Sequence, residues 1–215
     1  MDRITGAIMF KILFVIASYL LGSVCFGYVF AKISKKEDFG KNDLPGGAGS
    51  SRQLGFAKGI AVGFLDTLKG AIPPLLATRL FHWDNSLSGQ IAIVASCLAV
   101  IIGHNWPVFF KFRGGGGLST AIGISFALIP LECGIAFPVA IATGFIYKYT
   151  LAKRLPFSPI PVGAGMATLL LPILCYLYKE PWYITVLFSL IFVLLTVKSM
   201  VLTKLYGTRG QSQIS

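Results

Sequence analysis

Long apolar segments occupy most of this chain and leave it few ways to fold. They cover residues 7–31, 59–78, 90–110, 119–131, 134–147, 158–178 and 183–200. A helix needs about 20 apolar residues to cross a bilayer. Charged residues make up 13% of the sequence, against about 25% in soluble domains. The sequence therefore predicts a single domain over residues 1–215, an all-α integral membrane protein with a bundle of about seven transmembrane helices.

Two details refine this prediction. The first run is longer than the apolar part of a signal peptide and has no clear cleavage site, so we expect a retained helix. The fourth and fifth runs are short and are split by Pro130 and Glu132. They predict either two helices or one bent hairpin that does not fully cross the membrane.

Basic residues lie mostly in alternate loops. One set of loops holds Lys32, Lys35, Lys36, Lys41, Arg52, Lys58, Lys111, Arg113, Lys148, Lys153, Arg154, Lys198, Lys204 and Arg209. The opposite side holds Arg3, Arg79 and Lys179. Because Lys and Arg are enriched in cytoplasmic loops, the N-terminus is predicted outside and the C-terminus in the cytoplasm.

The net charge of +11 is therefore interpreted as a topology signal, and no nucleic-acid partner is expected. The cysteines Cys25, Cys97, Cys133 and Cys175 lie in apolar runs without metal-ligand spacing, so we expect buried small side chains. His82 and His104 are predicted in opposite halves of the bundle. No metal site and no cofactor is expected.

The segment at Gly114, Gly115, Gly116 and Gly117 is the strongest candidate for chemistry. A glycine loop can present several backbone N–H groups, and an anion binds well where such a loop opens a helix. Ser119 or Thr120 could cap that helix, and Arg113 adds a guanidinium that suits phosphate. The alternative is a flexible turn at the membrane surface.

Other polar residues are predicted near the same side of the membrane, the cytoplasmic one. Asp66 and Lys69 share a helix face and predict either a structural ion pair or a wall of the active-site cavity. His104 is either a hydrogen-bonded core residue or a general base. The segment 45–52 is a second glycine-rich stretch ending in an arginine, Arg52, and is either a second substrate loop or a solvated linker.

These residues resemble the bacterial acyl-phosphate:glycerol-3-phosphate acyltransferase family, known as PlsY. The resemblance covers most of the chain, including residues 19–23, 52–55 and 64–70, and is strongest at Gly103-His104-Asn105-Trp106-Pro107-Val108-Phe109 and the glycine loop that follows. It implies a seven-helix enzyme of the bacterial inner membrane. Such an enzyme transfers an acyl group from acyl phosphate to glycerol 3-phosphate, giving lysophosphatidic acid, and acts among membrane lipids.

Several positions depart from the family pattern. The family's second loop reads Phe-Lys-Gly-Gly-Lys-Gly, so Arg113 stands for the first lysine and Gly116 for the second. In the first loop Gly46 and Arg52 remain, but both asparagines and the first serine are lost. A Ser-Leu pair of the third loop corresponds only to Thr150-Leu151 or to Ser158. Lys198 falls near the position of a family histidine.

The resemblance implies the roles of the candidate site. Arg52, Arg113, His104 and Ser119 are the candidate catalytic residues. The substrate-binding candidates are Gly114, Gly115, Gly116, Gly117, Thr120, Asp66 and Lys69. Three hypotheses remain: an acyltransferase of phospholipid biosynthesis acting on glycerol 3-phosphate or a related phosphorylated acceptor, a catalytically silent member that binds lipid or a partner, and a small transporter.

Overall fold

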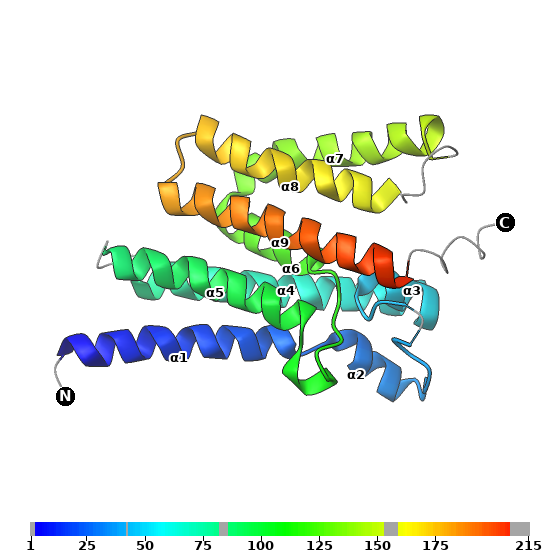
Figure 1. The fold of residues 1–215 in the computed structure, drawn as a ribbon, viewed down its shortest axis with the longest axis horizontal. Coiled ribbons are helices and arrows are strands. Elements are labelled where there is room, and N and C mark those ends of the chain that lie inside the picture. The colour runs from blue at the N-terminus through cyan, green and yellow to red at the C-terminus, as the bar shows by residue number, and fades with distance from the viewer. Residues whose placement is uncertain (1–2, 42, 82–85, 153–158, 207–215) are drawn as a thin grey trace. The chain divides into compact units, whose positions relative to one another are not determined.

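A computed structural model describes residues 3–41, 43–81, 86–152 and 159–206 of the protein (Figure 1). Within these residues every regular element is helical. The elements are α1 (Arg3–Ser23), α2 (Phe26–Ile33), α3 (Gly47–Leu54), α4 (Phe56–Phe81), α5 (Leu87–Asn105), the 3-10 helix η2 (Val108–Phe110), α6 (Leu118–Leu128), α7 (Pro130–Thr150), α8 (Pro159–Leu177) and α9 (Trp182–Tyr206).

The described chain has six apolar segments long enough to cross a membrane. They are 4–33, 56–81, 87–110, 130–150, 159–177 and 182–202. Helix α6 is apolar too, but its 11 residues extend only about 16 Å, against about 30 Å for the bilayer core. Many large apolar side chains on these segments are exposed, as a lipid-facing surface requires. The prediction of an all-α integral membrane bundle is confirmed; six segments have the length of a span, and α6 is a seventh, shorter apolar helix.

Two of the predicted runs differ from the observed helices. The first run is broken at Val24 and Cys25, where α1 ends and α2 begins. The fifth run is a full 21-residue helix, so a hairpin that turns back inside the membrane is wrong. Its earlier start has a local cause: Pro130 occupies the first helical turn, where its fixed φ suits a helix and its missing N–H costs nothing.

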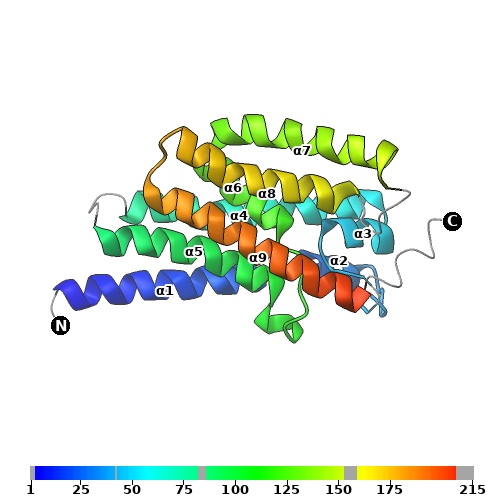
Figure 2. The same ribbon diagram turned by 45° about the horizontal axis from the view of Figure 1, so that its top comes forward.

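Contacts divide the chain into two compact units. The first contains residues 1–128 and 202–215, and the second contains residues 129–201. In the first, α1 lies along α5, while α4 contacts α3, α5 and α6. Figure 2 shows α1 running beside α5 in the same direction. In the second, α7 packs against α8. The single domain over 1–215 stays a prediction.

Helices in the first unit approach one another closely where glycine replaces a side chain. A Cβ added at Gly22 would lie 2.2 Å from the carbonyl oxygen of Val100, and one at Gly103 would lie 2.2 Å from that of Tyr19. Small residues are known to allow such close approach in membrane helices. All four cysteines are buried and free, as expected.

The close approach of α1 and α5 predicts a stability effect. Gly103→Ala should lower the thermal unfolding temperature in detergent by several degrees, because the new methyl group meets backbone that cannot move aside. Gly165→Ala in α8 is the matched control, since nothing lies within 4 Å of its Cβ position and alanine favours a helix. Equal unfolding temperatures for the two variants would contradict this packing.

The loop charges predict the orientation. Because the native cysteines are buried, a single exposed cysteine reports one position. Glu37→Cys should react with an impermeant thiol reagent only from the cytoplasm, and Leu87→Cys only from outside. Asn85, in the same outer loop, lies outside the described residues. Cytoplasmic labelling at residue 87 would reverse the topology.

Candidate active site

Three ionisable side chains meet in the core of the first unit. Lys69 Nζ lies 2.8 Å from Asp66 Oδ1, and His104 Nδ1 lies 3.5 Å from the same oxygen. All three residues are at most 2% exposed. The i,i+3 spacing in α4 brings Asp66 and Lys69 to one face, and α5 contributes His104.

Lys69 also holds the break in the first span. Its ammonium donates to the carbonyl oxygens of Val24 at 2.7 Å and Gly22 at 3.1 Å. These carbonyl oxygens have no N–H partner within the helix, because α1 ends at this point. With Asp66, they account for all three donors of an ammonium group. The geometry therefore favours the structural ion pair over a substrate-binding role for Asp66 and Lys69.

The His104 imidazole lies directly under the glycine loop. Gly115 N–H donates to the His104 carbonyl oxygen at 3.1 Å. A Cβ at Gly115 would lie 2.2 Å from His104 Nε2, and one at Gly114 would lie 2.0 Å from the His104 carbonyl oxygen. Since one ring nitrogen faces Asp66 and the other faces this loop, the imidazole is placed to support the loop.

The remaining two glycines differ in what they require. Gly117 has φ +84, a left-handed conformation that a side chain rarely adopts. Gly116 does not have a left-handed φ, and a Cβ at this position would meet no atom closer than 4.0 Å. Position 116 is therefore the one place in this loop where a side chain fits without strain. It is also the position at which the family resemblance expects lysine.

The glycine segment at the start of α3 lies beside the glycine loop that precedes α6. Gly46 is the N-cap of α3, and its Cβ position is 3.9 Å from Gly115 Cα. Gly47 packs against Gly63 of α4, with 3.0 Å between its Cβ position and Gly63 Cα. Helices α3 and α6 therefore begin close to each other, each after a glycine segment. No side chain caps α3, so its first N–H groups stay available to a ligand.

The two hydroxyl residues of α6 separate in space. Ser119 Oγ lies 4.0 Å from the Cβ position of Gly63, in the seam where α3 meets α4. Thr120 is fully buried, and its hydroxyl has no hydrogen-bond partner among the described residues. The expectation that either residue caps the helix is wrong, because α6 begins at Leu118 and both lie inside its first turn.

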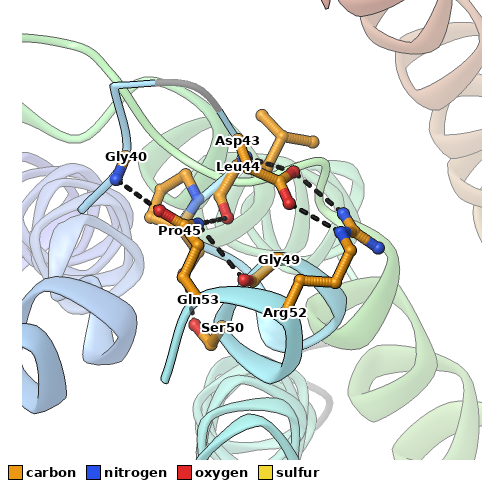
Figure 3. A network of polar contacts seen from close by, with 8 residues as sticks. All are labelled: Gly40, Asp43, Leu44, Pro45, Gly49, Ser50, Arg52 and Gln53. Carbon is orange, nitrogen blue, oxygen red and sulfur yellow. Dashed lines mark hydrogen bonds and ion pairs between the residues drawn. The ribbon is translucent and has the colours of Figure 1, made fainter. Parts of the chain in front are cut away.

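Arg52 is engaged by a residue that the sequence reasoning missed. Its Nε and Nη2 donate to the two carboxylate oxygens of Asp43 at 2.6 and 2.8 Å (Figure 3). The hydrogen bonds that Arg52 donates to this carboxylate raise the pKa of Arg52. The Asp43 carboxylate also accepts the N–H of Leu44 at 2.8 Å. Asp43 and Arg52 are nine residues apart, and no helical periodicity relates them. The sequence pattern therefore did not indicate this ion pair.

Gln53 completes the same network. Its side-chain oxygen accepts the Gly40 N–H at 2.9 Å, and its amide group donates to the carbonyl of Gly49 at 3.2 Å (Figure 3). The loop before α3 is thus tied to the helix at both ends, and the segment 45–52 is an ordered structure rather than a solvated linker.

The remaining candidates belong to other elements of the structure. Arg113 lines a groove beside Lys41 and Lys111, and Arg52 is not among the residues that line it. Lys198 is buried in α9, and Thr150 ends α7 with its hydroxyl donating to the Ile146 carbonyl. Ser158 lies outside the described residues. No group of three metal-ligating side chains occurs in the described ranges.

Known proteins match this chain over most of its length. The family comparison identifies glycerol-3-phosphate acyltransferase across residues 12–205. The glycerol-3-phosphate acyltransferase of Shouchella clausii is 41% identical over 154 residues, covering 70% of this chain and 73% of that protein.

Two solved structures of PlsY (YgiH), an integral membrane glycerol 3-phosphate acyltransferase, share the fold. The lysophosphatidic acid form matches with TM-score 0.73 and 32% identity, and the glycerol 3-phosphate form with TM-score 0.74 and 30% identity. Each match covers 92% of both chains. With the sequence match over nearly all of its apolar segments, this chain belongs to the glycerol-3-phosphate acyltransferase family.

Proposed function

We propose that this protein transfers an acyl group from acyl phosphate to the 1-hydroxyl of glycerol 3-phosphate at the bacterial inner membrane. The products are lysophosphatidic acid and inorganic phosphate. The observation that carries the proposal is the meeting of the two glycine segments, at Gly46 and Gly115, where α3 and α6 begin. Gly46, Gly47, Gly63, Gly115 and Ser119 are together called the glycine seam.

The glycine seam has the chemistry of a phosphate site. Two helices begin there, so their unpaired N–H groups and the positive ends of their dipoles add up at one place. The absence of a side chain at Gly46 lets a phosphate approach the backbone there, and the absence of one at Gly47 lets α3 pack against Gly63 of α4. Ser119 adds a hydroxyl at the edge of the seam. In a member of this family, the ligand that fits is the phosphate of acyl phosphate or of glycerol 3-phosphate.

The reaction itself needs mainly positioning and charge stabilisation. The hydroxyl oxygen of glycerol 3-phosphate attacks the acyl carbon, and the bond from that carbon to the phosphate oxygen breaks. Phosphate is a good leaving group, so holding both substrates in line supplies much of the rate. N–H groups directed at the departing phosphate stabilise the charge that develops on it.

His104 and Thr120 serve this site indirectly in our proposal. The imidazole of His104 holds Gly115 in place and takes its own orientation from Asp66. Thr120 contributes its backbone to the contact with α4, where a Cβ at Gly70 would lie 2.2 Å from the Thr120 carbonyl oxygen. The catalytic candidates are then Ser119 and the two arginines, Arg52 and Arg113.

Position 116 provides a direct test of the mechanism. Gly116→Lys should raise acyl transfer to glycerol 3-phosphate, because an ammonium there would stabilise the departing phosphate. One well-placed electrostatic donor is worth about 100-fold or more. The measurement is release of inorganic phosphate by the purified enzyme from acyl phosphate, with and without glycerol 3-phosphate.

Two controls isolate the charge. Gly116→Ala tests the added Cβ alone and should be nearly neutral, since the site has room. Gly115→Ala should abolish activity, because its Cβ would meet the His104 ring. If the alanine variant at 116 is normal and the lysine variant gains nothing, missing charge is not what limits activity, and a catalytically silent, lipid-binding member becomes the better description.

The two arginines are predicted to bind one anionic ligand. Arg52→Ala should weaken glycerol 3-phosphate binding by about 1–3 kcal/mol, the range for a charged hydrogen bond left unmade. Asp43→Ala is the matched control, because it removes the ion pair but leaves the guanidinium for the ligand. Equal weakening by both variants would assign Arg52 a structural role only. Unchanged binding in Arg52→Ala and in Arg113→Ala would refute a shared site.

A further inference from the structure

A groove of about 310 Å³ opens in the first unit outside the glycine seam. It is lined by Tyr28, Phe39, Lys41, Phe110, Lys111 and Arg113, among others, and by none of the seam residues. These residues come from α2, the loop that follows it, η2 and the turn after η2. Of these lining residues, Arg113 is also a catalytic candidate for acyl transfer, and the composition of the rest of the groove calls for an explanation of its own.

The groove carries an excess of positive charge. Lys41 pairs with Asp38 at 2.5 Å, and hydrogen bonding to that carboxylate raises the pKa of Lys41, so both groups stay charged. Across the described ranges, no ion pair involves Lys111 or Arg113. Two cations therefore face the groove without a carboxylate that neutralises them.

An aromatic floor fixes the shape of the groove. The rings of Tyr28 and Phe110 stack with centroids 4.7 Å apart, and Phe39 meets Tyr28 edge-on at 5.4 Å. Gly40 has φ +77 and leaves no space for a side chain, since a Cβ there would lie 2.7 Å from the Tyr28 hydroxyl oxygen. The loop therefore packs directly on the aromatic ring and closes one side of the groove.

The turn that carries the two cations has an uncommon backbone. Lys111 and Phe112 both have left-handed φ values, 52° and 58°, which residues with side chains seldom adopt. Such conformations persist where the surrounding structure imposes them, and they concentrate at functional sites. The turn places Lys111 and Arg113 on the groove while Phe109 and Phe112 stay 59% and 57% exposed.

The groove lies at a membrane surface. The apolar segments 4–33 and 87–110 run side by side in the same direction (Figure 2), and the groove residues lie in the last residues of these segments or shortly after them. We therefore expect the exposed rings of Phe109 and Phe112 at the depth where a lipid's acyl chains join its headgroup. The distribution of Lys and Arg among the loops predicts that this end of the bundle faces the cytoplasmic leaflet, which is rich in anionic lipid.

We propose that this groove binds the headgroup of an anionic phospholipid from the surrounding bilayer, with the lipid phosphate between Lys41 and Lys111, while Arg113 at the edge of the groove remains available to the substrate. The aromatic floor contacts the glycerol backbone, and the exposed phenyl rings contact the first carbons of the acyl chains. A zwitterionic lipid binds less well, because its own cation faces the same basic residues. The lipid is a bound component of the protein and is not consumed.

Native mass spectrometry of the full chain in detergent tests this directly. The probes are phosphatidylglycerol and phosphatidylcholine with identical acyl chains. The wild-type protein should retain one phosphatidylglycerol at a lower lipid concentration than phosphatidylcholine. The double variant Lys41→Gln with Lys111→Gln should weaken phosphatidylglycerol retention about tenfold or more, the scale expected for two cations at an anionic headgroup. Phosphatidylcholine retention should not change.

A matched variant distinguishes lipid binding in the groove from the effect of the protein's overall positive charge. Lys58→Gln with Lys148→Gln removes two exposed lysines outside the groove and should retain phosphatidylglycerol as the wild type does. Equal losses in the two double variants, or no preference for phosphatidylglycerol in the wild type, would overturn the proposal. Far-UV circular dichroism confirms that both variants are folded.

A competition experiment identifies the source of the phosphate. Glycerol 3-phosphate at concentrations that saturate turnover should not displace the bound phosphatidylglycerol, and inorganic phosphate should not either. Displacement by glycerol 3-phosphate, with a raised KM for it in Lys41→Gln with Lys111→Gln, would assign the groove to the substrate and refute the lipid site. Loss of acyl transfer without loss of lipid retention would count against the proposed function alone.

Discussion

The structure of the first unit depends on one charged pair placed in an apolar interior. Asp66 and Lys69 are fully enclosed, and an unpaired charge at that depth would be prohibitive. Lys69 forms an ion pair with Asp66 and donates to the two carbonyl groups freed where the first span breaks. Removing one partner of such a pair costs about 3–5 kcal/mol. The break between α1 and α2 therefore exists because a lysine from another helix completes its hydrogen bonds.

The glycine seam is built outward from the same pair. Asp66 orients His104, His104 holds Gly115, and Gly115 lies beside Gly46 at the start of α3. At Gly115 a larger residue would clash with the His104 ring. These contacts connect the buried ion pair to the backbone surface at which we propose that a phosphate binds.

Backbone contact explains why this seam uses glycine rather than cationic side chains alone. N–H groups held by two helices cannot rotate away, so they are ready for the phosphate before it arrives. Lysine and arginine side chains need to be immobilised first. In this protein the lysines Lys41 and Lys111 lie instead at the groove, for which we propose a lipid headgroup as the ligand. Two anion sites of different construction would then serve a soluble substrate and the membrane.

The apolar runs, the loop charges and the glycine motif were sufficient to predict a membrane bundle and its family. Hydropathy along the chain fixes the membrane bundle, because a lipid environment admits few alternatives. The family followed from the resemblance of the motifs. Sequence could not reveal that Arg52 binds Asp43, that Lys69 serves the break at Val24, or that Gly46 meets Gly115. These contacts join residues with no shared periodicity. Only the packing of α3, α4 and α5 brings them together, since the approach of two helices is decided by every side chain between them.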